Sequence, residues 1–158
     1  MRRILIAALV ATLLTGTMTM TAQAEQLGRW RGFCSTWREG ENLTPARFHA
    51  NPDAARAKIR RLIVCVFAKF APGESGVALV VADRESGLYP WAQNPSSLCS
   101  GLFQHILSAW PSRAESYLKR WMFGPGVSWP PPWSDPRANT IVAAKMVADP
   151  NIGWTPWS

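Results

Sequence analysis

The chain has 158 residues, of which 47% are hydrophobic, and its formal net charge is +7. This length fits one domain with its own core, and the absence of repeats and low-complexity tracts leaves no need for a second module. The positive charge favours an anionic polymer as partner, but no dense run of Lys or Arg occurs, so nucleic acid is not expected.

The first 24 residues have the layout of a secretory signal peptide. Arg2 and Arg3 precede an apolar run over residues 4–14, and Ala22-Gln23-Ala24 ends the segment as a cleavage site does. A membrane-spanning helix needs about 20 apolar residues, and polar residues interrupt this run before that length. We therefore expect cleavage before Glu25 and no stable membrane insertion of the mature protein.

The next signals mark an irregular arm and then a helix. Residues 25–50 mix aromatic and charged side chains without a sustained period of 2 or 3.6, which predicts an irregular arm. Asn51-Pro52-Asp53 is a helix-start signal with Pro near the first helical position. Apolar residues at steps of three and four follow as far as Phe70, and Pro72-Gly73 closes the predicted helix. We assign residues 51–158 to the functional domain.

A second helix is expected directly after the first. Ser75 can cap it, and the run Val77–Ala82 is apolar on every side, as in a segment that is buried all round. A buried strand has the same pattern, and periodicity does not separate the two. Gly87 and Pro90 break the chain just after Glu85. A buried helix would therefore aim the Glu85 carboxyl at an opening.

The remaining elements follow from turn and cap signals. Small and polar residues over 91–100 predict a tight loop or a short β-ribbon. A further helix is expected over residues 111 to about 121, and the Pro-rich segment 124–133 excludes continuous helix or sheet. Asp135-Pro136 starts a last helix, Asp149-Pro150 ends it, and a short aromatic tail follows.

Three short motifs in this region share their order and approximate spacing with a known family. They are Glu85-Ser86-Gly87, Asn94-Pro95 and Gly101-Leu102-Phe103-Gln104. The set resembles the catalytic region of lysozyme-like lytic transglycosylases, the group of the SLT enzymes and goose-type lysozymes. Phe103 stands where that family usually has Met, and Asn94 where Ser is common. The resemblance implies a mainly α, lysozyme-like fold with a short β-turn or ribbon segment beside the active-site cleft.

The resemblance also implies one catalytic acid, and Glu85 falls on its position. An isolated Glu at a helix end would be a solvated residue or a partner of Arg84, but a carboxyl beside apolar groups retains the proton that a leaving oxygen needs. Most glycosidases use two carboxylates, and after Glu85 only three others occur, two of them at predicted helix ends. They are Glu115, Asp135 and Asp149.

A lytic transglycosylase needs one carboxyl, because its substrate supplies an N-acetyl group and a 6-hydroxyl in place of a second carboxylate and water. The expected activity is therefore cleavage of the β-1,4 linkage between N-acetylmuramic acid and N-acetylglucosamine in peptidoglycan. The resemblance implies 1,6-anhydromuramoyl ends as the product. The partner is the glycan strand, and we expect a monomer that is secreted to the cell wall or periplasm.

Other residues are candidates for binding the glycan. Gln104 matches a family Gln whose amide can hold an N-acetyl or hydroxyl group, while Ser86 and Gly101 match residues that shape the turn. Turn solvation and backbone geometry explain Ser86 and Gly101 at least as well. Trp faces can stack on sugar rings. The candidate set is Ser86, Asn94, Gly101, Phe103, Gln104, Trp91, Trp154 and Trp157.

The cysteines and histidines allow two further predictions. Cys34, Cys65 and Cys99 all lie in the exported part, where disulfides form. A Cys65–Cys99 bridge would tie the site to the core and is the expected pair, although Cys34 with either partner stays possible. His49 and His105 have no other ligand residues at metal-site spacing, so neither a metal nor another cofactor is expected.

Three alternative functions stay open. A lysozyme-type hydrolase would cleave the same bond by activating water with a second carboxylate. A non-catalytic protein of the cell wall could bind glycan in the same groove, although such a protein need not keep Glu85. A basic, Trp-rich membrane-disrupting protein would need a continuous cationic amphipathic helix, and the basic residues are scattered instead.

Overall fold

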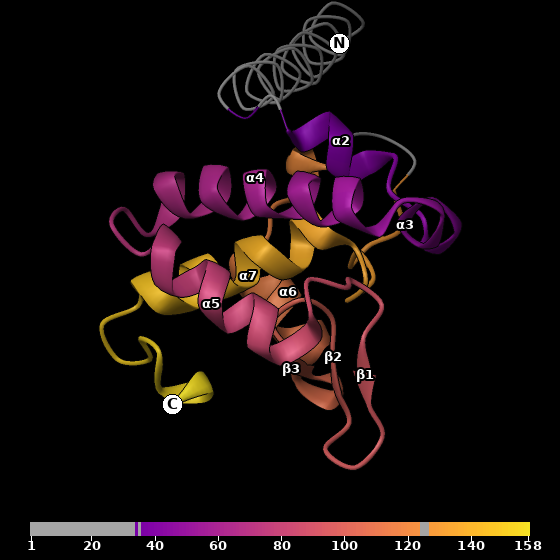
Figure 1. Cartoon of the computed structure of the whole chain (residues 1–158). Coiled ribbons are helices and arrows are strands. Elements are labelled where there is room, and N and C mark those ends of the chain that lie inside the picture. Colours follow the sequence, from indigo (N-terminus) through magenta and orange to yellow (C-terminus); the bar gives the residue numbers. More distant parts are fainter. Residues whose placement is uncertain (1–33, 35, 124–126) are drawn as a thin grey trace, which may run out of the picture.

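The protein is mainly α-helical with one small antiparallel sheet (Figure 1). The computed structural model describes residue 34 and residues 36–123 and 127–158, so the predicted signal peptide over residues 1–24 lies outside the described residues. Its helices are α2 (Trp37–Glu41), α3 (Pro45–Ala50), α4 (Pro52–Phe70), α5 (Ser75–Ser86), α6 (Trp110–Tyr117) and α7 (Pro136–Ala148). Its strands are β1 (Gln93–Asn94), β2 (Cys99–Ser100) and β3 (His105–Ile106), and short 3-10 helices cover Leu107–Ala109, Arg120–Met122 and Thr155–Trp157.

The two helices with clear cap signals begin and end where the sequence predicts. The Asn51 side chain accepts a hydrogen bond from the Ala54 backbone at 3.1 Å and starts α4. Asp135 accepts from the backbone N–H groups of Arg137 and Ala138 at 2.8 and 3.2 Å and starts α7. Such caps act within three residues, which is why a local pattern is enough to locate them.

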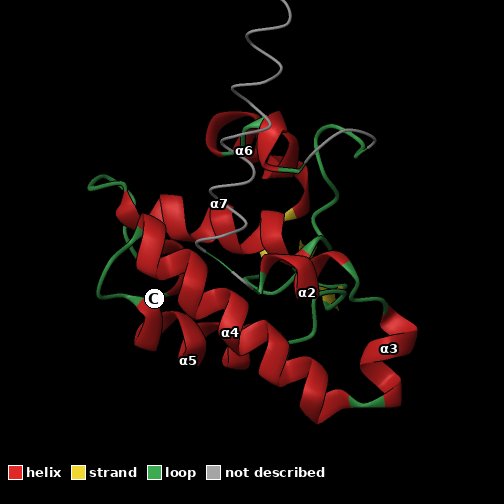
Figure 2. Cartoon of the chain, turned by 90° about the horizontal axis from the view of Figure 1, so that it is seen from above, coloured by secondary structure: helices red, strands yellow, loops and turns green. Residues whose placement is uncertain are grey.

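Helix α7 is the central helix of the fold. It contacts α2, α4 and α6, and it lies between α4 and α6 when the molecule is seen from above (Figure 2). Every residue from 136 to 144 is buried, including Arg137, Asn139 and Thr140. A helix that is buried on all sides is expected to be almost wholly apolar, so these three polar residues need hydrogen-bond partners. Thr140 finds one within the helix, because its hydroxyl donates to the Pro136 carbonyl at 2.6 Å.

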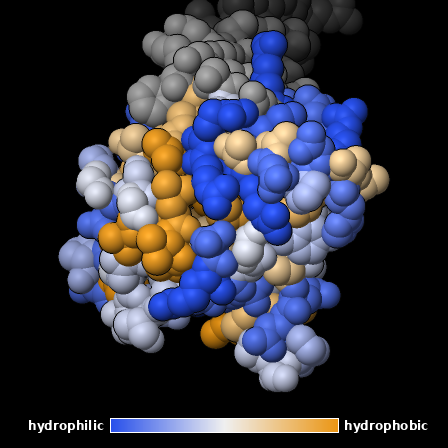
Figure 3. Space-filling view, in the orientation of Figure 1, coloured by the Kyte–Doolittle hydropathy of each residue, from blue (hydrophilic) through white to orange (hydrophobic). Residues whose placement is uncertain are grey.

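Helix α5 lies at the surface, and the expectation that its apolar run is buried all round is wrong. It packs against α4 and the core through one face of small and branched residues, Ala78, Val81 and Ala82. On the opposite face Val77 and Val80 are 47% and 69% exposed. Figure 3 shows hydrophobic surface over this helix, beside hydrophilic side chains. Ser75 does not cap α5, because it is the first residue of the helix and Glu74 occupies the N-cap position; its hydroxyl donates to the Val64 carbonyl.

Residues 36–50, predicted as part of an irregular arm, contain two short helices. The Thr44 side chain accepts from the Arg47 backbone at 3.2 Å, and Pro45 occupies the first turn of α3. This is the same Thr/Asn-Pro start signal that precedes α4. Helix α2 contributes the fully buried Trp37 to the core, so this part of the arm belongs to the folded domain.

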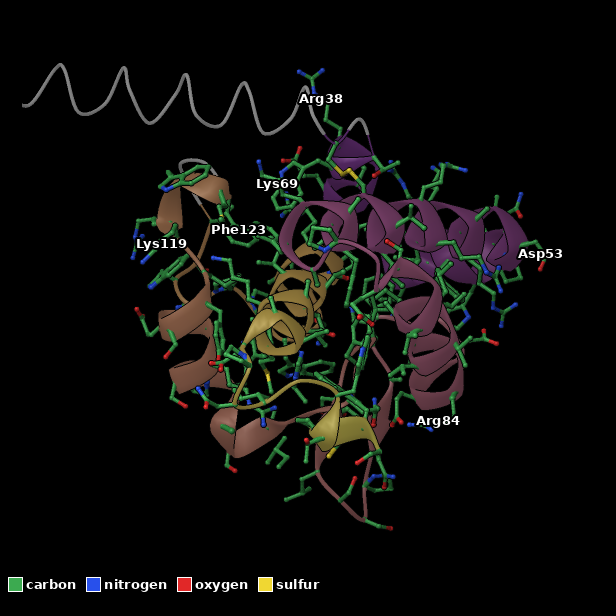
Figure 4. All side chains as sticks on the ribbon, turned by 90° about the vertical axis from the view of Figure 1, so that its left-hand side faces the viewer. Arg38, Asp53, Lys69, Arg84, Lys119 and Phe123 are labelled. Carbon is green, nitrogen blue, oxygen red and sulfur yellow. A yellow bond between two sulfur atoms is a disulfide. The ribbon has the colours of Figure 1, made fainter. Side chains whose placement is uncertain are left out.

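The disulfide joins Cys34 to Cys65, and the expected Cys65–Cys99 bridge is wrong. Helix α2 packs on α4 and on α7, which brings the Cα atoms of Cys34 and Cys65 to 5.8 Å. Figure 4 shows the bond beside α2 and α4. Cys99 is a free thiol on β2, in the ribbon that Figure 1 places far from α2. Spacing along the chain could not separate the two pairings, because helix packing decided which thiols meet.

The β-ribbon is present and extends beyond the predicted range of residues 91–100, because a third strand lies at His105–Ile106. Strand β2 pairs with β1, with Gln93 opposite Ser100, and also with β3, with Ser100 opposite His105. The turn between β2 and β3 is the Gly-Leu-Phe-Gln motif at residues 101–104. The ribbon extends below the C-terminal end of α5 in Figure 1.

Between the ribbon and α7 the chain is less regular. Helix α6 ends at Tyr117, because Leu118 is extended and the segment beyond it forms only a 3-10 turn. The described part of the Pro-rich crossing, residues 127–133, has neither helix nor strand, as predicted. Within the described ranges, no helix combines the length and the apolar character that crossing a membrane requires.

Candidate active site

Glu85 lies in the last turn of α5. Gly87 ends the helix in the left-handed conformation at φ 60°, with its N–H bonded to the Asp83 carbonyl at 2.8 Å. Leu88 follows at φ 62°, so the chain turns sharply away from the helix axis. The Glu85 side chain is 25% exposed. The carboxyl therefore stays at the end of the helix, partly covered and open to a ligand.

The 101–104 turn is fastened to this helix end. The Ser86 hydroxyl lies 3.0 Å from the Leu102 carbonyl and 2.9 Å from the Ala82 carbonyl, so its single proton bonds the turn to α5. The structure thus brings the Gly-Leu-Phe-Gln turn to the helix end that carries Glu85 and Ser86. Ser86 and Leu102 are sixteen positions apart in the sequence.

Asn139 of the central helix holds the turn from its other side. Its side-chain oxygen accepts from the Phe103 N–H at 2.9 Å, and its amide donates to the Trp133 carbonyl at the same distance. Gly101 has φ 85°, and a Cβ there would lie 2.1 Å from the Asn139 amide nitrogen and 2.9 Å from the Trp133 carbonyl. Sequence analysis missed Asn139, although an Asn among the apolar residues of a predicted helix was the available signal.

Gln104 and Phe103 have different places in the turn. Gln104 has φ 46°, and its amide nitrogen donates to the carbonyls of Gly101 at 2.9 Å and Ala92 at 3.3 Å. In this assignment the amide oxygen accepts no hydrogen bond from the described residues and can accept one from a ligand. Phe103 is fully buried against Phe67, so it anchors the turn and does not present its ring to a ligand.

Arg84 is bonded to the candidate acid. Its Nη2 and Nε lie 2.9 and 3.2 Å from Glu85 Oε1, and Nη2 also donates to the Trp157 carbonyl. Figure 4 shows Arg84 at the end of α5, close to the C-terminal segment. The Arg84 side chain is 59% exposed, so it can turn away when a ligand covers Glu85.

The tryptophan candidates are spread over the surface and the core. Trp157 is buried, with its indole N–H donating to the Phe103 carbonyl at 2.7 Å. Trp154 stacks on Phe67 with ring centroids 5.9 Å apart. Its indole donates to Glu74, which lies at the opposite end of α5 from Glu85.

Trp91 is half-buried and follows α5 closely. Its ring contacts Tyr89 at a centroid distance of 5.5 Å. The Tyr89 hydroxyl lies 3.3 Å from His49 Nε2 on α3, so these aromatic groups form a continuous surface beyond the helix end. Sequence analysis did not single out Tyr89, although its aromatic ring follows Glu85 by four residues.

Asn94 belongs to the ribbon. Its side-chain oxygen accepts from the backbone N–H groups of Ser96 and Ser97 at 3.0 and 3.2 Å, which closes the turn between β1 and β2. A hollow of about 350 Å³ lies here, and Glu85 does not line it. Its lining residues are Gln93, Asn94, Pro95, Leu98, Ser100 and Leu107.

His105 is a buried part of the scaffold under the turn. Its Nε2 lies 3.2 Å from the Asn139 carbonyl, and its Nδ1 lies 3.2 Å from Arg113 Nη1. Burial lowers the pKa of His105 to about 3; the hydrogen bond to the Asn139 backbone opposes this shift, and the positive charge of Arg113 adds to it. Burial also lowers the pKa of Arg113. His105 is therefore neutral, with Nε2–H as donor and Nδ1 as acceptor.

The lowered pKa predicts a loss of stability in mild acid. His105 binds a proton in the unfolded chain below its ordinary pKa of 6.5 but in the folded protein only near 3. Its stabilising contribution is thus complete above pH 6.5 and decreases toward pH 3, by up to about 1.4 kcal/mol per pH unit. We expect urea unfolding to show this decrease between pH 6.5 and 5, where few carboxylates titrate.

The matched control for this prediction is His105→Gln, which keeps polar groups at the site and does not titrate. The variant is less stable than the wild type at neutral pH, but its unfolding free energy should change less between pH 6.5 and 5. Equal slopes for the two proteins would contradict the assignment of a buried, neutral His105.

Comparison of the chain with protein-family models, with curated protein sequences and with solved structures finds no match. Among residues 34, 36–123 and 127–158, no group of three or more His, Cys, Asp or Glu side chains comes together as a metal site requires.

Proposed function

We propose that this protein cleaves the β-1,4 linkage between N-acetylmuramic acid and N-acetylglucosamine in peptidoglycan and leaves 1,6-anhydromuramoyl ends. The proposal includes a lysozyme-like fold, removal of residues 1–24 as a signal peptide, and action as a monomer in the cell wall or periplasm. The observation that supports it most directly is the Ser86–Leu102 hydrogen bond, which joins the Glu85 helix end to the turn that carries Gln104.

In this proposal Glu85 is the only group that transfers protons. The glycan displaces Arg84 from Glu85, the freed carboxylate takes up a proton from solvent, and the resulting carboxyl protonates the leaving glycosidic oxygen. The same group then removes the proton from the 6-hydroxyl as that oxygen attacks C1, which restores the protonated acid. Each bond that breaks is matched by one that forms within the substrate, so no water is consumed. Gln104 holds a donor group of the sugar through its free amide oxygen.

The other carboxylates after Glu85 support a single-acid reaction, because each already has a structural partner. Asp135 caps α7 and bonds Arg137 at 2.7 Å. Glu115 accepts from the Trp129 indole at 2.6 Å. Asp149 accepts from the backbone and side chain of Asn151. A hydrolase with two carboxylates would have to remove one of them from these contacts.

The products of the reaction test this proposal. We expect the purified mature protein to release muropeptides from peptidoglycan that are lighter by one water than hydrolysed ones, as measured by mass spectrometry. Glu115→Gln should leave this product pattern unchanged. Products with reducing ends, together with loss of turnover in a folded Glu115→Gln variant, would instead identify a hydrolase that uses Glu115.

One observation favours a second candidate, a protein that binds peptidoglycan glycan without cutting it. Arg84 holds Glu85 through two contacts to a single carboxylate oxygen, an arrangement that suits a structural ion pair. Such a protein would bind glycan strands and release no product over any incubation time. Its affinity for the strands would also persist when Glu85 is replaced.

A further inference from the structure

Helices α4 and α5 lie side by side as a hairpin with an exposed outer side. Near the turn between them, the Ser75 hydroxyl donates to the Val64 carbonyl at 3.4 Å. At the other end of the hairpin, Arg56 donates to the Gly87 carbonyl at 3.2 Å. Contacts at both ends keep the two helices together along their length, so the outer side of the hairpin is one face to which both helices contribute.

This face carries a cluster of exposed apolar side chains. Of the five large hydrophobic residues that are exposed in the described part of the chain, three lie here. Val64 is on α4 beside the start of α5, and Val77 and Val80 are on the outer side of α5. Figure 3 shows the hydrophobic surface over α5 and the hydrophilic side chains that border it. Single exposed apolar residues are ordinary, but a cluster with a polar rim marks a contact with a partner or a membrane.

The same face is basic. Helix α4 carries five Lys or Arg residues and one acidic residue, so its net charge is +4, against +7 for the whole chain. Arg60 and Arg61 are exposed and precede Val64 by four and three positions, which puts them beside it on the helix surface. Arg60 lies 3.8 Å from Asp83, but both side chains are at least half exposed, and such an ion pair is weak. Arg60 can therefore bind an anion from outside the protein.

This combination of groups matches an anionic lipid surface. Proteins that lie on a membrane place apolar side chains in the headgroup region, while Lys and Arg beside them meet the lipid phosphates. A second copy of the chain would bring two positive faces together, and like charges repel. A soluble anionic polymer would bind the arginines but would leave the three valines in water.

We propose that the outer face of the α4–α5 hairpin docks on an anionic phospholipid membrane. The contact is peripheral, because valine side chains reach only into the headgroup region and no helix is inserted. The docking face consists of Arg60, Arg61, Val64, Val77 and Val80.

Docking through this face leaves the candidate active site uncovered. Glu85 follows Val80 by five positions on α5, which is about 140° around the helix at about 100° per residue. The carboxyl therefore lies on a different side of the helix from the lipid contact. The inference does not rest on the proposed reaction, because no step of that reaction involves the docking face.

Sedimentation with lipid vesicles tests the proposal. The protein used begins at Glu25, which keeps every described element and removes the apolar run of residues 4–14. The probes are vesicles of phosphatidylcholine alone and vesicles in which about a quarter of the lipid is phosphatidylglycerol. We expect binding to the anionic vesicles only, and weaker binding as salt screens the charges. Equal binding to both kinds would overturn the proposal, and binding to neither would leave a protein as the partner of this face.

A double variant, Arg60→Gln with Arg61→Gln, measures the contribution of charge. We expect it to bind the anionic vesicles about 25-fold more weakly, since each cation near such a membrane contributes about fivefold. Its control is Lys119→Gln with Arg120→Gln, which removes the same charge beside α6, on the part of the molecule that Figure 4 shows away from α5. If the control weakens binding equally, the net charge of the chain and not this face attracts the lipid.

A second double variant, Val77→Gln with Val80→Gln, measures the apolar contribution. Both side chains are exposed and Gln is a good helix former, so the protein should stay folded. We expect binding about tenfold weaker, because these two partly exposed valines together bury about the apolar area of one full side chain. The same change at exposed Ile106 on β3 should have no effect. Unchanged binding by the double variant would mean that charge alone attracts the protein, and would overturn the proposal.

Discussion

Replacing Glu85 with Gln should abolish the release of muropeptides while the protein stays folded and still binds glycan strands. The amide has the shape of the carboxyl but carries no acidic proton. General acid catalysis by a positioned side chain contributes about 10²–10⁴ in rate, and here one group performs both proton transfers. We therefore expect a decrease in turnover of at least about 10³, or about 4 kcal/mol in the barrier. Initial rates of product release by mass spectrometry measure it.

Glu115→Gln is the matched control for this experiment, because it makes the same chemical change at a carboxylate that bonds Trp129 on another part of the surface. It should retain turnover close to that of the wild type. If Glu85→Gln keeps activity within about tenfold of wild type, a difference of about 1.4 kcal/mol, Glu85 is not the acid. If neither the wild type nor the variant releases product but both bind the strands, the protein is a glycan-binding protein.

Replacing Gly101 with Ala should destabilise the fold and disrupt the site together. Gly101 has φ 85°, a conformation that costs an L-residue about 1–2 kcal/mol. The added Cβ would also overlap the Asn139 amide and the Trp133 carbonyl. Overpacking in a tight core costs about 1–3 kcal/mol more. We expect a total loss of about 2–5 kcal/mol in unfolding free energy, measured by urea denaturation.

Gly73→Ala separates these two effects. Gly73 has a similar φ of 92°, but a Cβ there meets nothing within 4 Å. This control should therefore show only the conformational cost of about 1–2 kcal/mol. If Gly101→Ala is no less stable than Gly73→Ala, the close contact between the turn and Asn139 is not as tight as the structure has it. Far-UV circular dichroism verifies that each variant is folded before activity is compared.

The candidate site can be predicted only in part from the sequence. The motif spacing predicts that Glu85 and the 101–104 turn lie near each other, and the structure has a Ser86–Leu102 hydrogen bond between the end of α5 and this turn. The Arg84–Glu85 contact could be anticipated from adjacent residues. The roles of Asn139 and Trp157 could not be anticipated. Both bond Phe103 in the turn, but they lie 36 and 54 positions after it in the sequence.

Features that depend on residues within one or two turns of each other could be predicted from the sequence. The start of α4 at Asn51-Pro52, the start of α7 at Asp135-Pro136 and the break at Gly87 follow from local hydrogen bonding and backbone conformation. The mainly helical content was implied by the family resemblance, and the structure confirms it. The Thr44-Pro45 signal was equally local, so the helices of residues 36–50 were within reach of the same reasoning.

Which helix is central and which cysteines meet depends on long-range packing, which no local pattern reveals. Helix α5 has a more continuous apolar run than α7, which suggests burial, yet Val77 and Val80 face solvent. Helix α7 is buried although it carries Asn139 and Arg137, because both have partners. The distant 101–104 turn bonds Asn139, and Arg137 pairs with Glu41 on α2 and with Asp135 at the start of its own helix. A polar side chain can be buried where such partners exist, and whether they exist is a property of the packed fold and of no single segment.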